Sequence, residues 1–246
     1  INLISYNNII KEFLIMKILS WNCNGKFREK YKEILKYNAD IYVIQECEKP
    51  DKYFNKKYED FKNFANNYLW IGNNDNKGLA VFAKDNINLK ELKWKNYSLR
   101  YFLPILVNNK YTLLAVWAGK PYIEEYYVYQ QINIDNYDDN TILIGDFNSN
   151  VRWDRKHNIR THTNASNELK KKNLISVYHK VFNEIESQET KPTFYLHRNI
   201  NKPYHIDYAF CHKDLIKNFK VLDDYTHWLK YSDHLPIILE IKYNYT

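Results

Sequence analysis

Short apolar runs that end at polar residues recur along the chain. Thr141–Ile144 is apolar and β-branched, which is typical of a fully buried strand, and Gly145 ends it. Lys17–Trp21 and Asp40–Gln45 have the same character, and the segment between them, Phe27–Tyr37, has the spacing of an amphipathic helix. The first fifty residues therefore predict a β-α-β unit. Polar residues stand at the carboxyl end of both strands, where ligands of such sheets usually bind.

The rest of the pattern predicts further strands, a few helices and no second domain. We expect strands at Tyr68–Gly72, Leu79–Ala83, Leu99–Val107, Tyr111–Trp117, Thr193–Leu196, Tyr204–Cys211, Phe219–Leu222 and Pro236–Lys242. Hairpin turns are expected at Asn73–Lys77 and Asn108–Lys110, and helices at Tyr122–Asn133 and within Asn164–Lys172. The chain contains no Ser/Gly-rich linker, repeat or low-complexity segment. Residues 17–246 are therefore expected to form a single domain.

The first residues differ from the rest of the chain. Met16 is the only methionine, and a strand pattern begins directly after it. Residues 1–15 contain polar interruptions and lack a small-residue cleavage site, so they make a poor signal peptide. We expect translation to begin at Met16 and residues 1–16 to be a non-native or weakly ordered extension. The alternative is a genuine short helix packed on the domain surface.

Composition indicates a basic globular protein with free thiols. Of 246 residues, 45% are hydrophobic and 26% charged, and the net charge of +7 favours a polyanionic partner, nucleic acid first and an acidic membrane surface second. The three cysteines form neither a disulfide framework nor a Cys-x-x-Cys zinc pair, which predicts a reducing, cytoplasmic compartment. No apolar run has the length of a transmembrane helix, and nothing implies an obligate protein partner.

Candidate chemistry begins just after the buried strand at Thr141–Ile144. Asp146 and Asn148 stand two residues apart, so continued strand geometry would place both side chains on one face and Phe147 in the core. An acid beside an amide suits the handling of a water and a phosphate oxygen. The alternative is an ordinary polar turn, because Gly, Asp, Asn and Ser are common turn residues.

Similar polar residues follow other predicted strands in a set that turn chemistry alone does not predict. Each of them has a simple structural explanation when taken singly, such as a turn pair or a solvated strand end. The set consists of Asn22, Asn24, Glu46, Asp146, Asn148, Asp207, Asp233 and His234.

The motifs around these residues resemble the endonuclease/exonuclease/phosphatase family, which includes proteins like deoxyribonuclease I and exonuclease III. The matching stretches keep the family's order and are Ser20–Gly25, Ile44–Glu46, Gly78–Phe82, Gly145–Asn148, Pro192–Phe194, Ile206–Tyr208 and Ser232–Pro236. The presence of both Gly-Asp-Phe-Asn and Ser-Asp-His is a specific signal of this family. The resemblance implies an α/β fold, a four-layer sandwich of two packed β-sheets flanked by helices, with the site at one edge.

The resemblance also implies a metal site. Glu46 and Asp233, helped by Asn22, would hold a divalent ion in an oxygen-only shell, which suits Mg²⁺ or Mn²⁺. We expect no positively charged side chain of the protein to substitute for the ion at this site. Asn24 is expected to contact the substrate.

The catalytic roles implied by the resemblance suit the residue types. Asp146 would orient or deprotonate the attacking water, and Asn148 would hydrogen-bond the phosphate. His234 would lie against the scissile phosphate, either as a cation or as a base, and the resemblance leaves this choice open. Asp207 would accept a hydrogen bond from His234, fix its tautomer and raise its pKa.

Three positions depart from the family's pattern. Trp117 stands where members have Tyr or His near the phosphate, so a proton-transfer role is lost there, although a substrate contact remains. His205 replaces an arginine found in many members, and Tyr204 replaces a tryptophan that abasic-site enzymes tend to have. These departures argue against a true abasic-site endonuclease.

A basic stretch follows the Gly-Asp-Phe-Asn motif directly. Arg152, Arg155 and Lys156 surround Trp153, and basic residues interleaved with an aromatic suit a phosphate backbone and a stacked base. The alternative is a solvated surface loop.

The motifs and the basic stretch together predict a divalent-metal-dependent phosphodiesterase that hydrolyses nucleic acid, as a DNA endo- or exonuclease. A phosphatase or phosphodiesterase acting on a small or lipid phosphate ester is the alternative, and a binding module that lost its chemistry is a third possibility.

Overall fold

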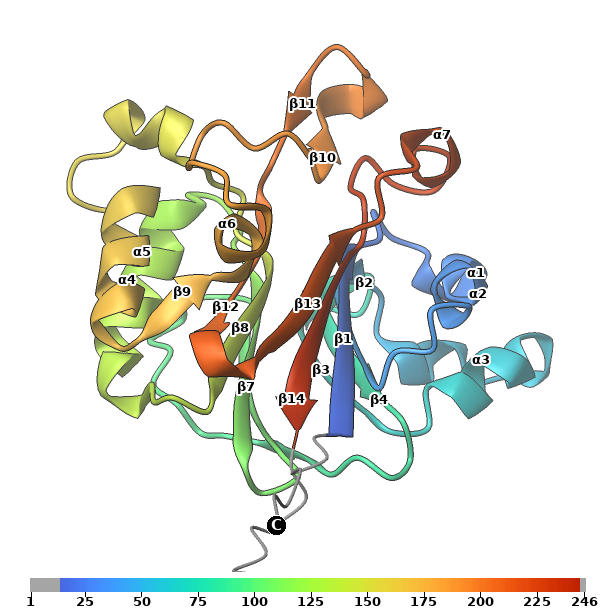
Figure 1. Ribbon diagram of the computed structural model, residues 1–246. Coiled ribbons are helices and arrows are strands. Elements are labelled where there is room, and N and C mark those ends of the chain that lie inside the picture. Colours follow the sequence, from blue (N-terminus) through green and yellow to red (C-terminus); the bar gives the residue numbers. More distant parts are fainter. Residues whose placement is uncertain (1–13, 244–246) are drawn as a thin grey trace, which may run out of the picture.

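The computed structural model describes residues 14–243, which contain two six-stranded mixed β-sheets (Figure 1). Neighbouring strands of the first sheet are β13 (Ile216–Val221), β14 (Ile237–Tyr243), β1 (Leu14–Asn22), β2 (Ile41–Cys47), β4 (Lys77–Ala83) and β3 (Tyr68–Asn74). Those of the second are β5 (Leu89–Glu91), β6 (Phe102–Val107), β7 (Tyr111–Trp117), β8 (Thr141–Asp146), β12 (Asp207–His212) and β9 (Leu174–Ser176). In each sheet one neighbouring pair is parallel, β1 with β2 and β7 with β8.

Helices cover the outer faces of the two sheets. Helices α4 and α5 lie outside the second sheet, and α1, α2 and α3 lie on the opposite side of the molecule (Figure 1). This arrangement confirms the predicted sandwich. The α-helices are α1 (Phe27–Lys30), α2 (Lys32–Leu35), α3 (Glu59–Phe64), α4 (Ile123–Asn133), α5 (His162–Lys171), α6 (Val177–Phe182) and α7 (Tyr225–Trp228). The 3₁₀-helices are η1 (Pro50–Tyr53), η2 (Lys56–Tyr58), η3 (Ile134–Asn136), η4 (Val151–Lys156), η5 (Leu196–Arg198) and η6 (Lys213–Leu215).

The core follows from the alternation of side chains along the strands. Ile142 and Ile144 of β8 belong to the cluster that includes the first sheet, whereas Leu143 between them joins Tyr126 of α4 and Leu169 of α5. Successive strand side chains point to opposite faces, so one apolar run serves both layers. Full burial of each aliphatic side chain contributes about 1.5–3 kcal/mol. The buried strand predicted at Thr141–Ile144 is therefore confirmed, and it extends to Asp146.

Several predicted elements have different boundaries. Strand β1 begins at Leu14, before Met16, and pairs with β14 from Leu14 opposite Tyr243. The prediction for residues 1–13 lies outside the described residues. The helix predicted at Phe27–Tyr37 is two short helices that meet at Tyr31.

Two predicted strands are shorter or divided. The strand predicted from Leu99 begins at Phe102, because Tyr101 has a positive φ of 66° that interrupts extended backbone. The strand predicted at Tyr204–Cys211 is divided into β11 (Pro203–Tyr204) and β12, and β11 pairs with β10 (Phe194–Tyr195) as a small separate hairpin.

Topology brings the expected site residues to one edge of the two sheets. Asp146 is the last residue of β8 and Asp207 the first of the antiparallel β12, and the two are direct register partners. Asn22 ends β1, and His234 lies three residues before β14, the antiparallel neighbour of β1. Loops from both sheets therefore meet above this edge. Within residues 14–243, no helix is long and apolar enough to cross a membrane.

Candidate active site

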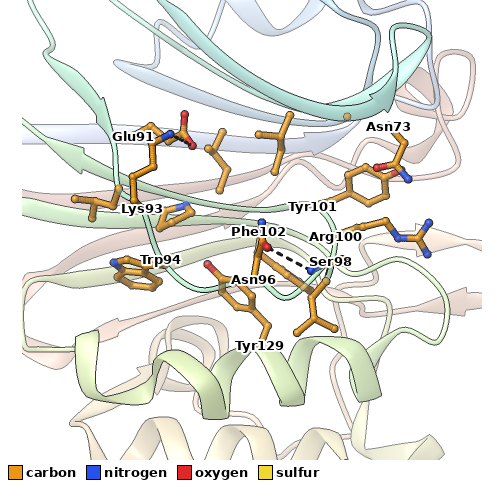
Figure 2. A pocket seen from close by; sticks show the side chains of 16 residues that line it. Asn73, Glu91, Lys93, Trp94, Asn96, Ser98, Arg100, Tyr101, Phe102 and Tyr129 are labelled. Carbon is orange, nitrogen blue, oxygen red and sulfur yellow. Dashed lines mark hydrogen bonds and ion pairs between the residues drawn. The ribbon is translucent and has the colours of Figure 1, made fainter.

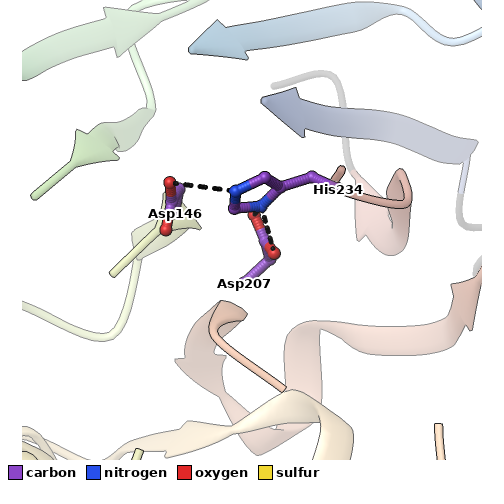
Figure 3. A group of neighbouring side chains, drawn as sticks. All are labelled: Asp146, Asp207 and His234. Carbon is purple, nitrogen blue, oxygen red and sulfur yellow. Dashed lines mark hydrogen bonds and ion pairs between the residues drawn. The ribbon is translucent and has the colours of Figure 1, made fainter. Parts of the chain in front are cut away.

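His234 lies between two carboxylates (Figure 3). Its Nδ1 is 3.0 Å from Oδ2 of Asp207, and its Nε2 is 3.8 Å from Oδ2 of Asp146. All three side chains are almost completely buried, with at most 5% of any of them exposed. The expected pairing of Asp207 with His234 is therefore present, and it directs the second ring nitrogen toward Asp146.

Thr193 holds the backbone on both sides of the His234–Asp207 pair. Its hydroxyl Oγ1 accepts hydrogen bonds from the backbone N–H groups of Ile206 and Asp207, both at 3.0 Å. Its carbonyl oxygen accepts the N–H of Leu235 at 2.7 Å, directly after His234. One fully buried threonine thus joins the segments that carry the histidine and its carboxylate partner.

Two amide side chains orient Asp146. Nδ2 of Asn22 donates to Asp146 Oδ2 at 2.9 Å, and Nδ2 of Asn148 donates to the same oxygen at 3.1 Å. Asn148 has a φ of 48°, so strand geometry ends at Asp146 and a turn returns the amide to the acid. The expected closeness of Asp146 and Asn148 is present, but the expected reason, strand alternation, is wrong. Phe147 is buried in the core as predicted.

The pKa values of Asp146 and His234 are both raised, for different reasons. Burial raises the pKa of Asp146 well above that of an ordinary carboxyl group, although the nearby His234 acts against this. Burial alone would lower the pKa of His234, but the negative charges of Asp207 and Asp146 outweigh it and raise that pKa. The environment therefore favours an imidazolium at His234.

The acidic residues predicted to bind metal lie nearer the surface. Asn24 donates to Asp233 Oδ1 at 3.1 Å, and Glu46 stands at a β-bulge between β2 and β4 with a φ of 57°. The Oε2 atom of Glu46 is 2.6 Å from Nζ of Lys77. The expectation that this site contains no preformed cation is wrong, because the Lys77 ammonium lies against Glu46.

The two acidic side chains predicted to bind metal have the donor chemistry that a hard divalent ion requires. Glu46 and Asp233 offer carboxylate oxygens, and the ammonium held by Glu46 shows that positive charge is favourable there. Asn22, the third predicted ligand, is engaged elsewhere: its Oδ1 accepts the backbone N–H of Asn24 at 3.1 Å. The buried group at the sheet edge is a second possible position, since one ligand atom each of Asp146, Asp207 and His234 lie within 4.8 Å of one another.

Trp117 lies next to the catalytic group in the sheet. It is the parallel register partner of Asp146, and its ring stacks on that of Tyr101 with centroids 4.5 Å apart. Only 9% of Trp117 is exposed. Trp117 therefore lies beside Asp146, with its ring stacked on Tyr101, and its contact with substrate stays a prediction.

A cavity of about 340 Å³ opens beside Asn148 and the 3₁₀-helix η4. Phe194, whose ring is 4.6 Å from that of His234, also lines it, so one aromatic ring lies between the cavity and His234. Two of the predicted substrate-binding residues, Trp153 and Lys156, contribute to its wall. The cavity is large enough to admit a substrate group next to the reacting centre.

The other predicted basic residues lie on the outside of η4. Arg152 and Arg155 are exposed, and the Arg152 guanidinium lies 5.4 Å above the ring of Tyr204. Tyr204 also packs against Trp153, with ring centroids 5.2 Å apart. His205 points away from this surface into the protein, where its Nδ1 is 2.8 Å from the carbonyl oxygen of Lys191.

A larger cavity of about 570 Å³ is lined by Tyr101, the stacking partner of Trp117, together with Lys93 and Arg100 (Figure 2). It was not predicted from the sequence. Its cations are balanced by nearby acids, because Lys93 pairs with Glu91 at 2.9 Å and the backbone and side chain of Arg100 both contact Glu125. This charge balance makes it a weaker phosphate site than the surface around η4.

The chain thus combines two packed sheets with a buried Asp–His–Asp group at one edge. The model of the Endonuclease/Exonuclease/phosphatase family matches residues 19–234, and the chain therefore belongs to that family. A comparison with curated proteins finds no match.

Solved structures support the same fold at low sequence identity. The endonuclease domain of TRAS1, a telomere-specific non-LTR retrotransposon, is 18% identical, with a TM-score of 0.64 over 93% of this chain and 99% of that chain. A 3′-5′ exonuclease from Neisseria meningitidis is 16% identical, with a TM-score of 0.67 over 93% and 100%. An AP endonuclease from Archaeoglobus fulgidus is 18% identical, with a TM-score of 0.64 over 91% and 98%.

Proposed function

We propose that the protein is a divalent-metal-dependent phosphodiesterase that hydrolyses nucleic acid, with DNA as its substrate. The observation that carries this proposal is the position of the cavity beside η4. Asn148 and Phe194, which contact Asp146 and His234, line it on one side, and Trp153 and Lys156 of the basic segment line it as well. A base or sugar in the cavity would bring the adjoining phosphate to His234, while the basic side chains follow the backbone.

Glu46 and Asp233, with Asn22 nearby, would hold Mg²⁺ or Mn²⁺. Their oxygen atoms suit an ion that keeps several waters, and the sequence offers no Cys/His cluster of the kind that binds Zn²⁺. When bound, such an ion polarises the phosphoryl oxygen and stabilises the charge of the leaving group. Lys77 must leave Glu46, at least in part, for the ion to bind.

Asp146 orients the attacking water and accepts its proton. Its carboxylate is held in one orientation by Asn22 and Asn148, so little reorganisation is needed at the moment of reaction. Asn148 also lines the cavity, where it can hydrogen-bond a phosphate oxygen. The raised pKa of Asp146 makes it a stronger base than an ordinary carboxylate.

His234 stabilises the negative charge that develops on the phosphate. The raised pKa of His234 supports the cationic role that the sequence left open. Asp207 fixes the ring so that Nδ1 faces its carboxylate and Nε2 faces the reacting centre. Trp117 beside Asp146 offers one N–H donor and no titratable group, so proton transfer depends on Asp146 and His234.

The solved structures favour nucleic acid over other phosphoesters. These structures include endonucleases and a 3′-5′ exonuclease, and one is a 3′ phosphatase from Neisseria bound to a product DNA hairpin. The phosphatase supports the second candidate, a phosphatase or phosphodiesterase acting on a small phosphate ester, because the same His–Asp group would serve it. The buried free thiols Cys23, Cys47 and Cys211 support a reducing, cytoplasmic compartment.

Purified protein with Mg²⁺ should be tested against supercoiled plasmid, single-stranded DNA, RNA, an abasic duplex and a generic phosphodiester. We expect cleavage of DNA at the highest kcat/KM, without dependence on an abasic site. A preference for the generic phosphodiester, with no cleavage of any nucleic acid, would contradict the proposal and favour the small-substrate alternative.

A further inference from the structure

Asn150 connects η4 to the inner part of the protein. Its Oδ1 accepts the backbone N–H of Arg152 at 3.0 Å and so caps the first turn of η4. Its Nδ2 is within hydrogen-bond distance of three acceptors: Oε1 of Glu189 at 3.1 Å, the carbonyl oxygen of His205 at 3.2 Å and the hydroxyl of Tyr208 in β12 at 3.0 Å. Asn150 is 2% exposed, so these contacts are shielded from water. The orientation of this one amide therefore sets where η4 begins.

Glu189 fixes that orientation from a distant part of the chain. Its side chain is 4% exposed, and its Oε1 accepts hydrogen bonds from Asn150 at 3.1 Å, from His179 Nε2 at 3.2 Å and from the Ser187 backbone N–H at 3.1 Å. On the other side of the imidazole, His179 Nδ1 is 2.7 Å from the Ser176 hydroxyl. Three donors thus converge on a single oxygen of a buried carboxylate.

The carboxylate keeps its charge in this position. Burial alone would raise the pKa of Glu189, but the hydrogen bonds from His179 and from backbone amides lower it to about 2. A charged acceptor makes stronger hydrogen bonds than a neutral one. Removing it would leave Nδ2 of Asn150 with two neutral acceptors, the His205 carbonyl and the Tyr208 hydroxyl, and would therefore weaken the hold on the amide orientation that caps η4.

We propose that Glu189, held by His179, is a positioning residue for substrate binding: through Asn150 it fixes η4 and thereby the side chains of Arg152 and Trp153. The inference rests on the proposed function of η4 as part of the nucleic-acid surface. It assigns a role to a residue that contacts neither the cavity nor the catalytic group.

The catalytic pair is held separately. Thr193 joins Asp207 to the segment after His234, and within residues 14–243 Glu189 hydrogen-bonds none of Thr193, Asp207 and His234. Asn150 also contacts His205 and Tyr208 beside Asp207, but Thr193 holds the Asp207 backbone independently of it. Loss of Glu189 should therefore weaken substrate binding without disabling the chemistry. This separation predicts a change in KM without a comparable change in kcat.

The test compares Glu189→Ala, Glu189→Gln and the matched control Glu186→Gln. Glu186 lies in the same loop, and within residues 14–243 its ion-pair partner is the surface residue Lys170, at 3.7 Å. For a labelled DNA duplex we expect Glu189→Ala to raise KM about tenfold with kcat within about twofold, as for the loss of one charged buried hydrogen bond. Glu189→Gln should restore most of the loss, because its amide oxygen can accept from the same donors. An equal fall in kcat with an unchanged KM would overturn the proposal.

Hydrogen exchange gives a second measurement that does not depend on activity. The amides of residues 151–156 should exchange faster in Glu189→Ala than in the wild-type protein, and at the wild-type rate in Glu186→Gln. His179→Ala, which removes one of the donors to Glu189, should give an intermediate effect and serves if Glu189→Ala does not fold. Unchanged exchange in these variants would overturn the positioning role. If the wild-type protein cleaves no nucleic acid, faster exchange would still support the positioning role, and only the proposed function would fail.

Discussion

Lys77 and Glu46 form an ion pair in which the ammonium nitrogen lies 2.6 Å from a carboxylate oxygen. Glu46 is the carboxylate that we propose as a metal ligand, and the backbone bulge at this residue carries it out of the regular pairing of β2 with β4. The positive charge of Lys77 therefore lies against a group that a divalent ion would use. Metal binding must compete with this ammonium.

Lys77→Met should tighten metal binding. A partly exposed ion pair contributes up to about 1 kcal/mol, so its removal should lower the Kd for Mn²⁺ by about two- to fivefold, as measured by isothermal titration calorimetry. Lys52→Met is the matched control, because Lys52 pairs with Asp75 at 3.8 Å near the same hairpin. Unchanged or weaker Mn²⁺ binding in Lys77→Met would show that the ammonium does not compete with the ion.

Thr193→Val should destabilise the protein and slow catalysis. Valine keeps the shape of threonine but cannot accept the buried N–H groups of Ile206 and Asp207, and each unsatisfied group costs about 1–3 kcal/mol. Urea unfolding should show this loss, and kcat should fall because Asp207 is no longer fixed. Thr193→Ser retains the acceptor and should stay close to the wild-type values. Equal stability and turnover in the two variants would argue against this role of the hydroxyl.

His162 should make the protein sensitive to mild acid. Burial lowers the pKa of His162 to about 4, with Asp154 and Glu189 acting to raise it and His179 and His205 to lower it further. A histidine in the unfolded chain has a pKa of about 6.5. As the pH falls below this value, the unfolded chain takes up a proton that folded His162 does not, so the free energy of unfolding decreases.

The pH dependence can be isolated with His162→Gln. Between pH 7 and pH 5, the free energy of unfolding of the wild-type protein should fall by about 2 kcal/mol more than that of His162→Gln. Urea unfolding at the two pH values measures this difference. Parallel pH dependences of the two proteins would show that His162 is not the group responsible.

The surface of η4 should make binding dependent on salt. Each Lys or Arg that touches a phosphate of duplex DNA contributes about −0.9 to the slope of log affinity against log salt. Replacing the exposed residues Arg152, Arg155 and Lys156 by Ala should therefore flatten the slope by roughly two to three units, measured by fluorescence anisotropy in Ca²⁺. A control triple variant replaces three exposed lysines away from η4, namely Lys62, Lys213 and Lys217. An equal slope in the two triple variants would indicate a surface loop rather than a nucleic-acid contact.

Much of the fold could be predicted from local pattern. The apolar run at Thr141–Ile144 becomes a buried strand because both of its faces are covered, and polar residues end the strands at one edge because the chain turns back there. Short elements such as α3 (Glu59–Phe64) escaped prediction, since about one and a half turns contain too few residues to show a helical period. The motifs and their order along the chain predicted which strands end at the same edge of the two sheets.

The contacts that organise the site could not be predicted in this way. Asn148 reaches Asp146 through a positive φ, and strand alternation gives no sign of that turn. Thr193, Lys77 and Glu189 act on residues between 13 and 39 positions away, as the separations to Ile206, Glu46 and Asn150 show. Such contacts depend on the register of strands and loops that meet only in the folded protein.

The central claim is that Asp146 and His234 act as one group on a phosphodiester in the presence of a divalent ion. The most direct test measures kcat for a fluorescein-labelled DNA duplex with the wild-type protein, Asp146→Asn and His234→Ala in Mg²⁺, and with metal-stripped wild-type protein in EDTA. We predict that each substitution lowers kcat by at least about 10²-fold while circular dichroism and Tm show an intact fold, and that chelation abolishes hydrolysis. Near wild-type turnover in either variant, or continued hydrolysis in EDTA, would contradict the account.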